Sequence, residues 1–288
     1  PSPLPQLLLD YVKILTTVCS VLVVLIDVNV IGTAHSPSNE KTMIRKLLVP
    51  IFALFFVAKA PAEDVWLGMF MQGQRVGYTQ STESEDTYNG KKANKSVSKT
   101  VMDAALLGTA LKMEILSTTW SIDGKPKRID FSVTSAGREQ AVVAMFLANR
   151  ITLDIDNNGA KSKKTLALPK DDPVVDDAML ALLQEGVKAG ASRTYYVLDP
   201  LTATLVKNTA THKGEAKTTI KGAEVSGVLI VIAEPRASTN IYLSESGDFL
   251  KAESIMGIEM LPITEAEALE GSGAYTPKID LALNTSIK

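Results

Sequence analysis

Side chains that commonly carry out chemistry are scarce in this chain of 288 residues, which contains one cysteine, Cys19, and two histidines, His35 and His212. A single cysteine excludes a disulfide within the chain and any metal site built from several cysteines. Two histidines leave little material for a zinc site or a Ser-His-Asp triad, and the sequence lacks a G-x-S-x-G motif. The sequence therefore points away from an enzyme, and it predicts no catalytic residue and no cofactor.

One stretch matches the first half of a calcium-binding loop. Asp154, Asp156 and Asn158 place oxygen donors at alternate positions, and Gly159 follows them, as in an EF-hand. The twelfth position of that loop is Thr165, where an EF-hand has a bidentate glutamate. A strand that runs into an Asn-Gly turn explains the same residues. Calcium ligands and turn residues are therefore both open interpretations here.

Two groups of acidic residues are further candidates for chemistry. The first group, which could hold a cation or stabilise the start of a helix, is Asp171, Asp172, Asp176 and Asp177. The second group, which could supply an acid and a base, is Glu253, Glu259, Glu265 and Glu267. A glycosidase-like pair requires defined distances between carboxyl groups, and the sequence does not provide them.

Methionine is frequent, with nine residues in the chain. Met69 and Met71 are two positions apart, so they share one face of an expected strand and could offer thioethers to Cu(I). Methionine also fills irregular cores and lines adaptable apolar pockets. The residues predicted to line such a pocket are Met69, Met71, Met113, Met145, Met179 and Leu182.

Alternation of apolar and polar residues between turn signals dominates the chain and predicts antiparallel strands. Asn89-Gly90, Asp123-Gly124 and Asn158-Gly159 are strong two-residue hairpin turns, and Gly73-Gln74 is expected to join the first two strands. The expected strands are 65–71, 75–85, 92–102, 110–122, 127–134, 140–148, 151–155, 164–168, 193–198, 201–211, 217–220, 227–234, 239–243, 249–254 and 258–261.

One amphipathic helix is expected in the middle of the chain. Asp172 can cap it, Pro173 suits its first position, and Gly186 or Gly190 can end it. Its apolar stripe is Val174, Val175, Ala178, Met179, Leu182 and Leu183. A second, short helix is expected at 264–270. His212, beside Lys213-Gly214, is expected in a solvated turn.

About a dozen antiparallel strands cannot remain a flat sheet, because exposed edges and an unburied apolar face would aggregate. The predicted fold class is therefore mainly β: a large, curved antiparallel sheet that forms a half-barrel, a barrel or a sandwich. The mid-chain helix is expected to cross its concave, apolar face.

The segment that begins at Met43 has the three parts of a secretory signal. Arg45 and Lys46 form its basic start, 47–58 its apolar run, and Ala60-Pro61-Ala62 its small-residue exit. Residues 47–58 would rise about 18 Å as a helix, which is short of the roughly 30 Å hydrocarbon core of a membrane. We therefore expect export to the bacterial periplasm or cell envelope.

The expected organisation has four parts. Residues 1–42 are an upstream segment that is either untranslated or a marginal membrane anchor, and 43–62 are the signal. Residues 63–270 form a single β-rich domain, and 271–288 are a flexible tail or a linker to a further domain. The net charge of −2 argues against a nucleic-acid partner, and membrane contact is expected only through the N-terminal apolar segments.

Three short motifs resemble those of an uncharacterised group of bacterial exported proteins, in which a β domain precedes a transglutaminase-like domain. These motifs are 65–78, 120–126 and 242–251, and Asp171-Asp172-Pro173 also falls where the resemblance expects it. The resemblance covers about 65–270 and implies an accessory or binding domain, with any catalytic Cys, His and Asp lying beyond Lys288. At the level of fold, the chain is also similar to half-barrel lipoprotein carriers and outer-membrane-associated β proteins.

The sequence predicts a non-enzymatic, exported β domain that binds an apolar ligand, such as a lipid or acyl chain, or a partner domain on its concave face. The alternative is the N-terminal accessory part of a transglutaminase-like cysteine enzyme.

Overall fold

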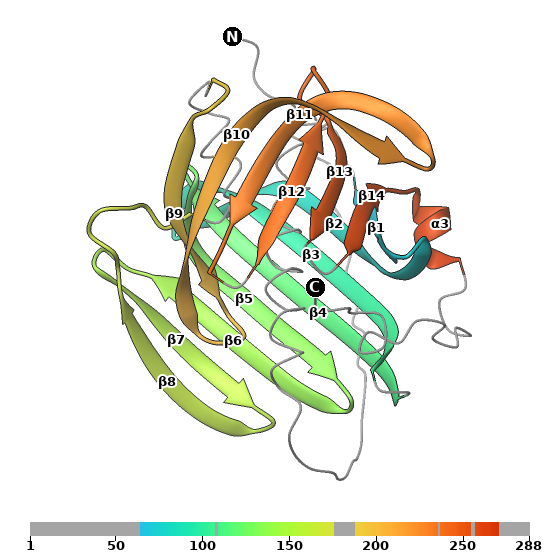
Figure 1. The fold of residues 1–288 in the computed structure, drawn as a ribbon. Coiled ribbons are helices and arrows are strands. Elements are labelled where there is room, and N and C mark those ends of the chain that lie inside the picture. Colours follow the sequence, from blue (N-terminus) through green and yellow to red (C-terminus); the bar gives the residue numbers. More distant parts are fainter. Residues whose placement is uncertain (1–63, 107–108, 176–187, 236, 255–256, 271–288) are drawn as a thin grey trace, which may run out of the picture.

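The computed structural model describes residues 64–106, 109–175, 188–235, 237–254 and 257–270, apart from the side chains of 104–111. These residues are mainly β (Figure 1). The strands are β1 (Val65–Met71), β2 (Gln74–Tyr88), β3 (Lys91–Leu106), β4 (Thr109–Ile122), β5 (Lys125–Ser135), β6 (Arg138–Phe146), β7 (Arg150–Asn157), β8 (Ala160–Ala167), β9 (Ser192–Asp199), β10 (Thr204–Ile220), β11 (Ala223–Ala233), β12 (Ser238–Leu243), β13 (Phe249–Ser254) and β14 (Ile258–Pro262); the described helix is α3 (Glu265–Leu269).

The described strands form one antiparallel sheet of 14 strands, in the order β8-β7-β6-β5-β4-β3-β2-β1-β14-β13-β12-β11-β10-β9. Strands that follow each other in sequence pair, except β8 and β9, which form the two edges of the sheet. β1 also pairs with β14 and so joins the two halves of the chain. Figure 1 shows these halves as two facing layers, one running from blue to yellow-green and the other orange. The sheet is therefore curved and β-barrel-like, as the alternation predicts.

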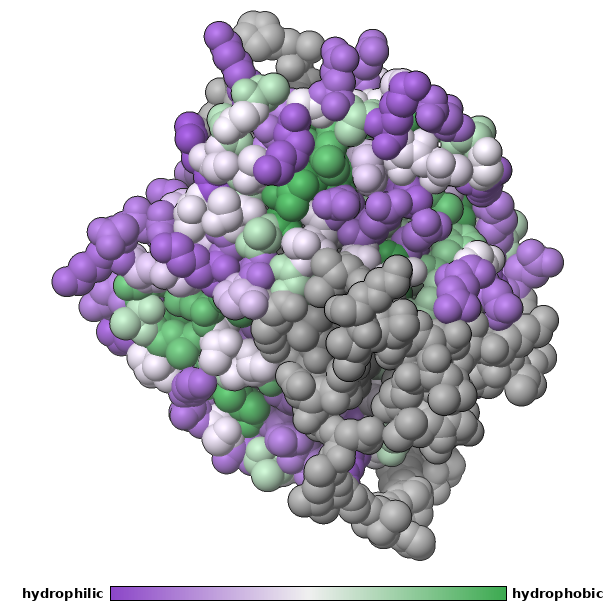
Figure 2. Space-filling view, viewed as in Figure 1, coloured by the Kyte–Doolittle hydropathy of each residue, from purple (hydrophilic) through white to green (hydrophobic). Residues whose placement is uncertain are grey.

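The core lies between the two layers, on what we call the inner face. Ile115 and Phe131 from one half and Tyr195 and Ile230 from the other belong to one buried cluster. Across the same gap, the Gln140 side chain donates a hydrogen bond to the Leu201 carbonyl, at 3.0 Å. The visible side of the molecule is mostly hydrophilic, with apolar side chains showing in patches (Figure 2). Curling the sheet thus buries the apolar residues of both halves against each other.

The two edges of the sheet are protected in different ways. At β9, Tyr196 exchanges backbone hydrogen bonds with Pro173 and Val175, so that Val174 forms an isolated parallel bridge. At β8, nearly every residue is exposed, and Lys161, Lys163 and Lys164 are among them. Lysine on an edge strand opposes pairing with another chain.

Two-residue turns set the register of the hairpins. Asn89-Gly90, Asp123-Gly124 and Asn158-Gly159 turn as predicted, with positive φ at both residues. The first turn is Gln72-Gly73, one residue earlier than the predicted Gly73-Gln74, because Gln72 and Gly73 are the pair with positive φ (51° and 75°). Ala136-Gly137 and Lys221-Gly222 turn in the same way without an Asn or Asp at the first position.

Strand β10 runs unbroken from Thr204 to Ile220, so the prediction of two strands with His212 in a turn was wrong. A bulge between His212 and Gly214 keeps the ladder with β11 intact, and the Gly214 N–H donates to His212 Nδ1, at 3.1 Å. Beyond this bulge, the tip of the β10–β11 hairpin bends over the top of the sheet towards α3 (Figure 1). The bulge therefore redirects one long hairpin onto the other face of the sheet, the outer face.

The predicted short C-terminal helix is confirmed as α3, whereas most of the predicted mid-chain helix, at 176–187, lies outside the described residues. The start of that helix was placed wrongly, since Val174 pairs with Tyr196 as an isolated β-bridge. The upstream segment, the signal and the tail also lie outside the described residues. Within the described part, no helix is long and apolar enough to span a membrane.

Candidate functional site

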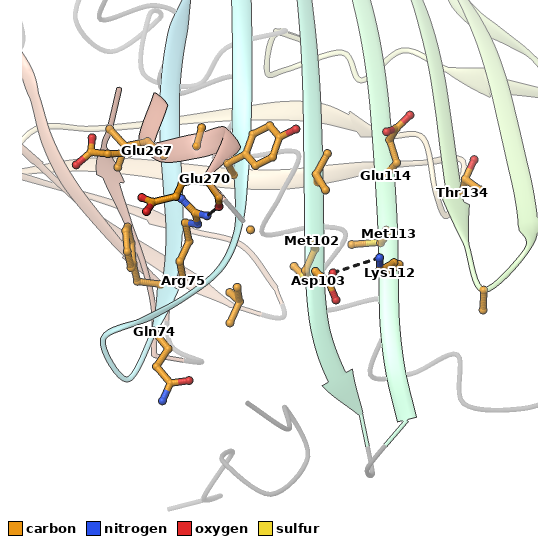
Figure 3. Close-up of a pocket in the computed structure, with 18 of the residues that line it drawn as sticks. Gln74, Arg75, Met102, Asp103, Lys112, Met113, Glu114, Thr134, Glu267 and Glu270 are labelled. Atoms are coloured by element: carbon orange, nitrogen blue, oxygen red, sulfur yellow. Dashed lines mark hydrogen bonds and ion pairs between the residues drawn. The ribbon is translucent and has the colours of Figure 1, made fainter. Parts of the chain in front are cut away.

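A cavity of about 1090 Å³ lies on the outer face, at the end of the sheet near α3 (Figure 3). Strands β2 to β5 supply its floor, α3 one wall, and the tip of the β10–β11 hairpin a further edge. Its described lining includes Phe70, Gln74, Arg75, Val76, Gly77, Tyr78, Val101, Met102, Asp103, Lys112, Met113, Glu114, Thr134, Ala136, Gly137, Lys221, Ile263, Glu267, Ala268 and Glu270. A volume of this size is at the upper end of the range for small-molecule sites.

Most of the cavity floor consists of residues that face outward in the alternating pattern of the strands. Tyr78, Val101, Glu114 and Thr134 are direct partners on successive strands, so they form one row on the outer face. Apolar side chains reach this face because glycine leaves room for them: a Cβ added at Gly68 would lie 2.6 Å from the Phe70 ring. The floor thus combines apolar surface with a few polar groups.

The wall formed by α3 is fixed by its first turn. The Thr264 side chain accepts a hydrogen bond from the Glu267 N–H, while Glu267 accepts from the Thr264 N–H, which makes a capping box. The backbone hydrogen bond from Thr264 holds the pKa of the Glu267 carboxyl below its usual value of 4.5, and the Thr264 hydroxyl adds to this effect. The Arg75 guanidinium donates to the Glu270 carbonyl and ties the other end of the helix to β2.

A buried lysine holds the β10–β11 hairpin in place. Lys251 Nζ donates to the Thr219 carbonyl at 3.0 Å and lies 2.6 Å from Glu253 and 2.7 Å from Glu259. Burial lowers the pKa of this ammonium, but the hydrogen bonds to Glu253 and Glu259 outweigh burial and raise the pKa above 10.5. We call these residues the Lys251 clasp. The clasp fixes the hairpin whose tip residue Lys221 borders the cavity.

Two cross-strand ion pairs lie at the floor of the cavity. Lys112 Nζ is 3.6 Å from Asp103 Oδ2, and Figure 3 shows the two side chains side by side on β4 and β3. Lys99 lies 2.8 Å from Glu114, and the hydrogen bond that the Lys99 ammonium donates to this carboxylate raises the pKa of Lys99. The Asp103–Lys112 contact is the looser of the two and leaves the other Asp103 oxygen without a partner.

The predicted pocket methionines Met69, Met71 and Met113 lie in the inner core, where each is at most 2% exposed. Met69 pairs with Met260 on one side, and Met102 pairs with Met113 two strands away, with Gly77 between the two pairs. Met69 Cε fills the space beside Gly77, 2.5 Å from where a Cβ would lie. The methionines thus form a packed row across five strands, while ligand binding and Cu(I) binding by them stay predictions.

Of the other predicted pocket residues, the structure describes only Met145, which lies away from this row. Met145 is on the outer face of β6, where its sulfur lies 3.8 Å from the Tyr88 hydroxyl. Met179 and Leu182 lie outside the described residues. Among the four predicted residues that the structure describes, Met113 alone also lines the outer cavity.

The candidate calcium ligands all take part in the hairpin around β7. Asp154 lies 3.0 Å from Lys163, Asp156 accepts a hydrogen bond from the Gly159 N–H, and Asn158 accepts one from the Glu139 N–H. Within the described ranges, no cluster of three or more His, Cys, Asp or Glu residues could hold a metal ion. These contacts support the interpretation of the three residues as turn residues, and the calcium site stays a prediction.

The remaining acidic candidates serve different contacts. Glu253 and Glu259 share Lys251, and Glu267 belongs to the capping box of α3. Asp172 lies 3.1 Å from Lys207 on β10, and Asp176 and Asp177 lie outside the described residues.

Comparison with known proteins finds no matching family model and no matching curated protein. Among solved structures, the chain is similar to a β-barrel-like protein of the domain of unknown function DUF1849 from Brucella abortus, with a TM-score of 0.47 and 11% sequence identity. The similarity covers 69% of this chain and 93% of that chain.

Most residues that line the cavity were not predicted as site residues. Arg75, Asp103 and Lys112 are ordinary outward-facing charges in the sequence, and their signal is only that they alternate with buried residues. Their proximity depends on strand register, which pairs Asp103 with Lys112, and on contacts such as that between Arg75 and Glu270, which are 195 residues apart.

Proposed function

We propose that this chain is a non-catalytic binding domain that holds an amphipathic ligand in its outer cavity. The observation that supports this proposal is the cavity of about 1090 Å³ itself, whose lining combines apolar side chains with charged ones. Phe70, Val101 and Ile263 offer apolar surface to a hydrocarbon body. Arg75, Lys221 and Glu267 offer polar contacts at the border. Ligand sites commonly combine apolar walls with a few placed polar groups.

The cavity is a better location for a ligand than the concave inner face. Leu67, Met69 and Ile230 on that inner face are fully buried, and they belong to the packed cluster between the layers. An acyl chain at that position would have to displace core side chains, at a cost in packing. The outer cavity accepts a ligand without this cost.

Binding can be tested with the full chain and N-phenylnaphthylamine, an apolar probe that fluoresces more strongly in apolar surroundings. We expect saturable binding with one probe per chain. Val101→Glu, which places a carboxylate on the cavity floor, is expected to abolish it. Val97→Glu is the matched control, because Val97 is on the same face of β3 but outside the cavity lining. Non-saturable binding, or equal binding by both variants, would contradict the proposal.

We further propose that the domain works outside the cytoplasm, in the bacterial periplasm or cell envelope. The support is the signal-like segment 43–62, with its basic start, apolar run and small-residue exit. Expression of the full chain in a bacterium, followed by mass spectrometry of the periplasmic fraction, is expected to find a product that begins at Glu63. An uncleaved cytoplasmic product would contradict export.

The three motifs 65–78, 120–126 and 242–251 carry a second proposal, an accessory role beside a transglutaminase-like domain. In the structure they form the β1–β2, β4–β5 and β12–β13 hairpins. Sequencing of the gene downstream of Lys288 tests this role. An in-frame domain with Cys, His and Asp would support it, and a stop codon would reject it.

A further inference from the structure

Asp103 has an unusual position for a carboxylate in this cavity. Its Oδ1 atom is buried and has no hydrogen-bond partner in the described structure, although Asp103 lies in the cavity lining. Its other oxygen is 3.6 Å from Lys112, a lysine whose side chain is 67% exposed. A buried acceptor without a donor costs free energy, so a site that keeps one is suited to a ligand that supplies the donor.

The other cavity carboxylates whose contacts the structure gives are already engaged. Glu114 is paired with Lys99 at 2.8 Å, and Glu267 accepts hydrogen bonds from the Thr264 N–H and hydroxyl. Arg75, a cation of the lining that lies on β2, is engaged as well, because it donates to the Glu270 carbonyl. Asp103 is therefore the acidic group of the lining that is best placed to receive a new hydrogen bond.

Apolar groups lie next to this carboxylate. Val101 precedes it on the same face of β3, and Phe70 and Ile263, which are both partly exposed, line the same cavity. A molecule that reaches Asp103 would thus place a hydrocarbon chain along Val101. A protonated amine would form a charge-assisted hydrogen bond with the Asp103 carboxylate, which is about twice as strong as a neutral one.

We propose that the ligand of the cavity is an amphipathic amine whose ammonium group donates a hydrogen bond to the Asp103 carboxylate, a side chain that is 20% exposed. This inference rests on the proposed function, since it requires that the cavity binds an amphipathic molecule. It adds the chemical class of the head group and the residue that recognises it.

The test is displacement of N-phenylnaphthylamine from the full chain by dodecylamine and by dodecanoate, each below its aggregation concentration. We expect dodecylamine to bind more tightly than dodecanoate, which offers only acceptors to Asp103. Asp103→Asn is expected to weaken dodecylamine binding about tenfold, because it removes the charge from this hydrogen bond. Its effect on dodecanoate should be small or favourable.

Asp154→Asn is the matched control. Asp154 and Lys163 are also direct cross-strand partners with an ion pair, but they lie on β7 and β8, outside the cavity lining. This variant should keep the amine preference of the parent chain. Lys112→Gln is a second variant on an exposed side chain, and it should strengthen dodecylamine binding about threefold by removing a competing cation.

The possible failures are distinguishable. If N-phenylnaphthylamine does not bind saturably, the proposed function itself fails. If the probe binds but dodecanoate displaces it as well as dodecylamine does, the amine inference alone is overturned. The same holds if dodecylamine is preferred and neither Asp103→Asn nor Lys112→Gln changes the preference.

Discussion

Replacement of Lys251 by methionine tests whether the clasp holds the β10–β11 hairpin over the outer face. The lysine side chain is only 4% exposed, and its ammonium donates to the Thr219 carbonyl and contacts two carboxylates. Methionine keeps much of the apolar stem but removes these contacts. Glu253 and Glu259, which are direct partners on β13 and β14, would then face each other without a cation between them.

The expected loss of stability follows from these contacts. Glu253 and Glu259 are 32% and 41% exposed, so water screens part of their attraction to Lys251. With about 1 kcal/mol for each of the two carboxylate contacts and about 1 kcal/mol for the bond to Thr219, the loss is about 3 kcal/mol. In a domain of this size, that corresponds to a fall in Tm of roughly 6–12 °C.

Urea denaturation of the full chain and of Lys251→Met measures this loss, and hydrogen exchange of the hairpin amides shows where it acts. Lys217→Met is the control on the same hairpin, because the Lys217–Glu224 pair is 65% exposed on both sides and should contribute less than about 1 kcal/mol. The reasoning is refuted if Lys251→Met unfolds within 0.5 kcal/mol of the parent chain, a margin typical of surface substitutions. Unchanged exchange at the hairpin tip would refute it too.

The effect of Lys251 also depends on pH. Because the folded state raises the pKa of Lys251 above 10.5, the lysine's contribution is fully present below about pH 10.5 and is lost as the pH rises through the folded-state value. The stability difference between the parent chain and Lys251→Met should therefore shrink in that alkaline range. A constant difference up to pH 12 would contradict this reasoning.

Three further changes have defined outcomes. Ala136→Asn should raise the free energy of unfolding by about 0.5–1 kcal/mol, because residue 136 has a φ of 50° in an exposed turn and asparagine tolerates that conformation. A urea midpoint at or below that of the parent chain would contradict this. Gly77→Ala should lower the free energy of unfolding by about 1–3 kcal/mol, because the new Cβ would lie 2.3 Å from the Val101 carbonyl oxygen. Urea denaturation measures this loss too, and an unchanged midpoint would count against the close packing at Gly77. Thr264→Ala should cost about 1 kcal/mol by removing the cap of α3. It should also raise the pKa of Glu267 part of the way towards 4.5, because the hydroxyl bond is lost while the bond from the residue 264 N–H, the larger cause of the lowered pKa, remains. The stabilisation that is present above pH 4.5 and lost at lower pH should therefore shrink. An NMR titration of the Glu267 carboxyl would show no such rise if the cap were unimportant.

Local signals were enough to predict most strands and several turns. Asn89-Gly90 and Asp123-Gly124 combine residues that accept positive φ, and the alternation beside them is regular. The helix α3 was predictable in the same way, from Thr264 followed three residues later by Glu267. These features depend on neighbours in sequence, so the sequence alone specifies them.

Features that depend on tertiary contacts were not predictable. Lys213-Gly214 has the composition of a turn, but pairing with β11 on both sides of the bulge keeps β10 continuous. The methionines at 69, 102, 113 and 260 become one row only through the register of four strand pairs. The outer cavity joins residues from both ends of the described chain, such as Arg75 and Glu270. No local pattern contains that information.

The position of a bound amphipathic molecule tests most directly whether the outer cavity is the ligand site. Crystals of the full chain soaked with 12-bromododecanol can locate the bromine by its anomalous scattering. We expect a bromine peak in the outer cavity, near Phe70 and Val101 and beside α3. A peak on the inner face beside Met69 and Ile230, or no ordered bromine at saturating ligand, would contradict it.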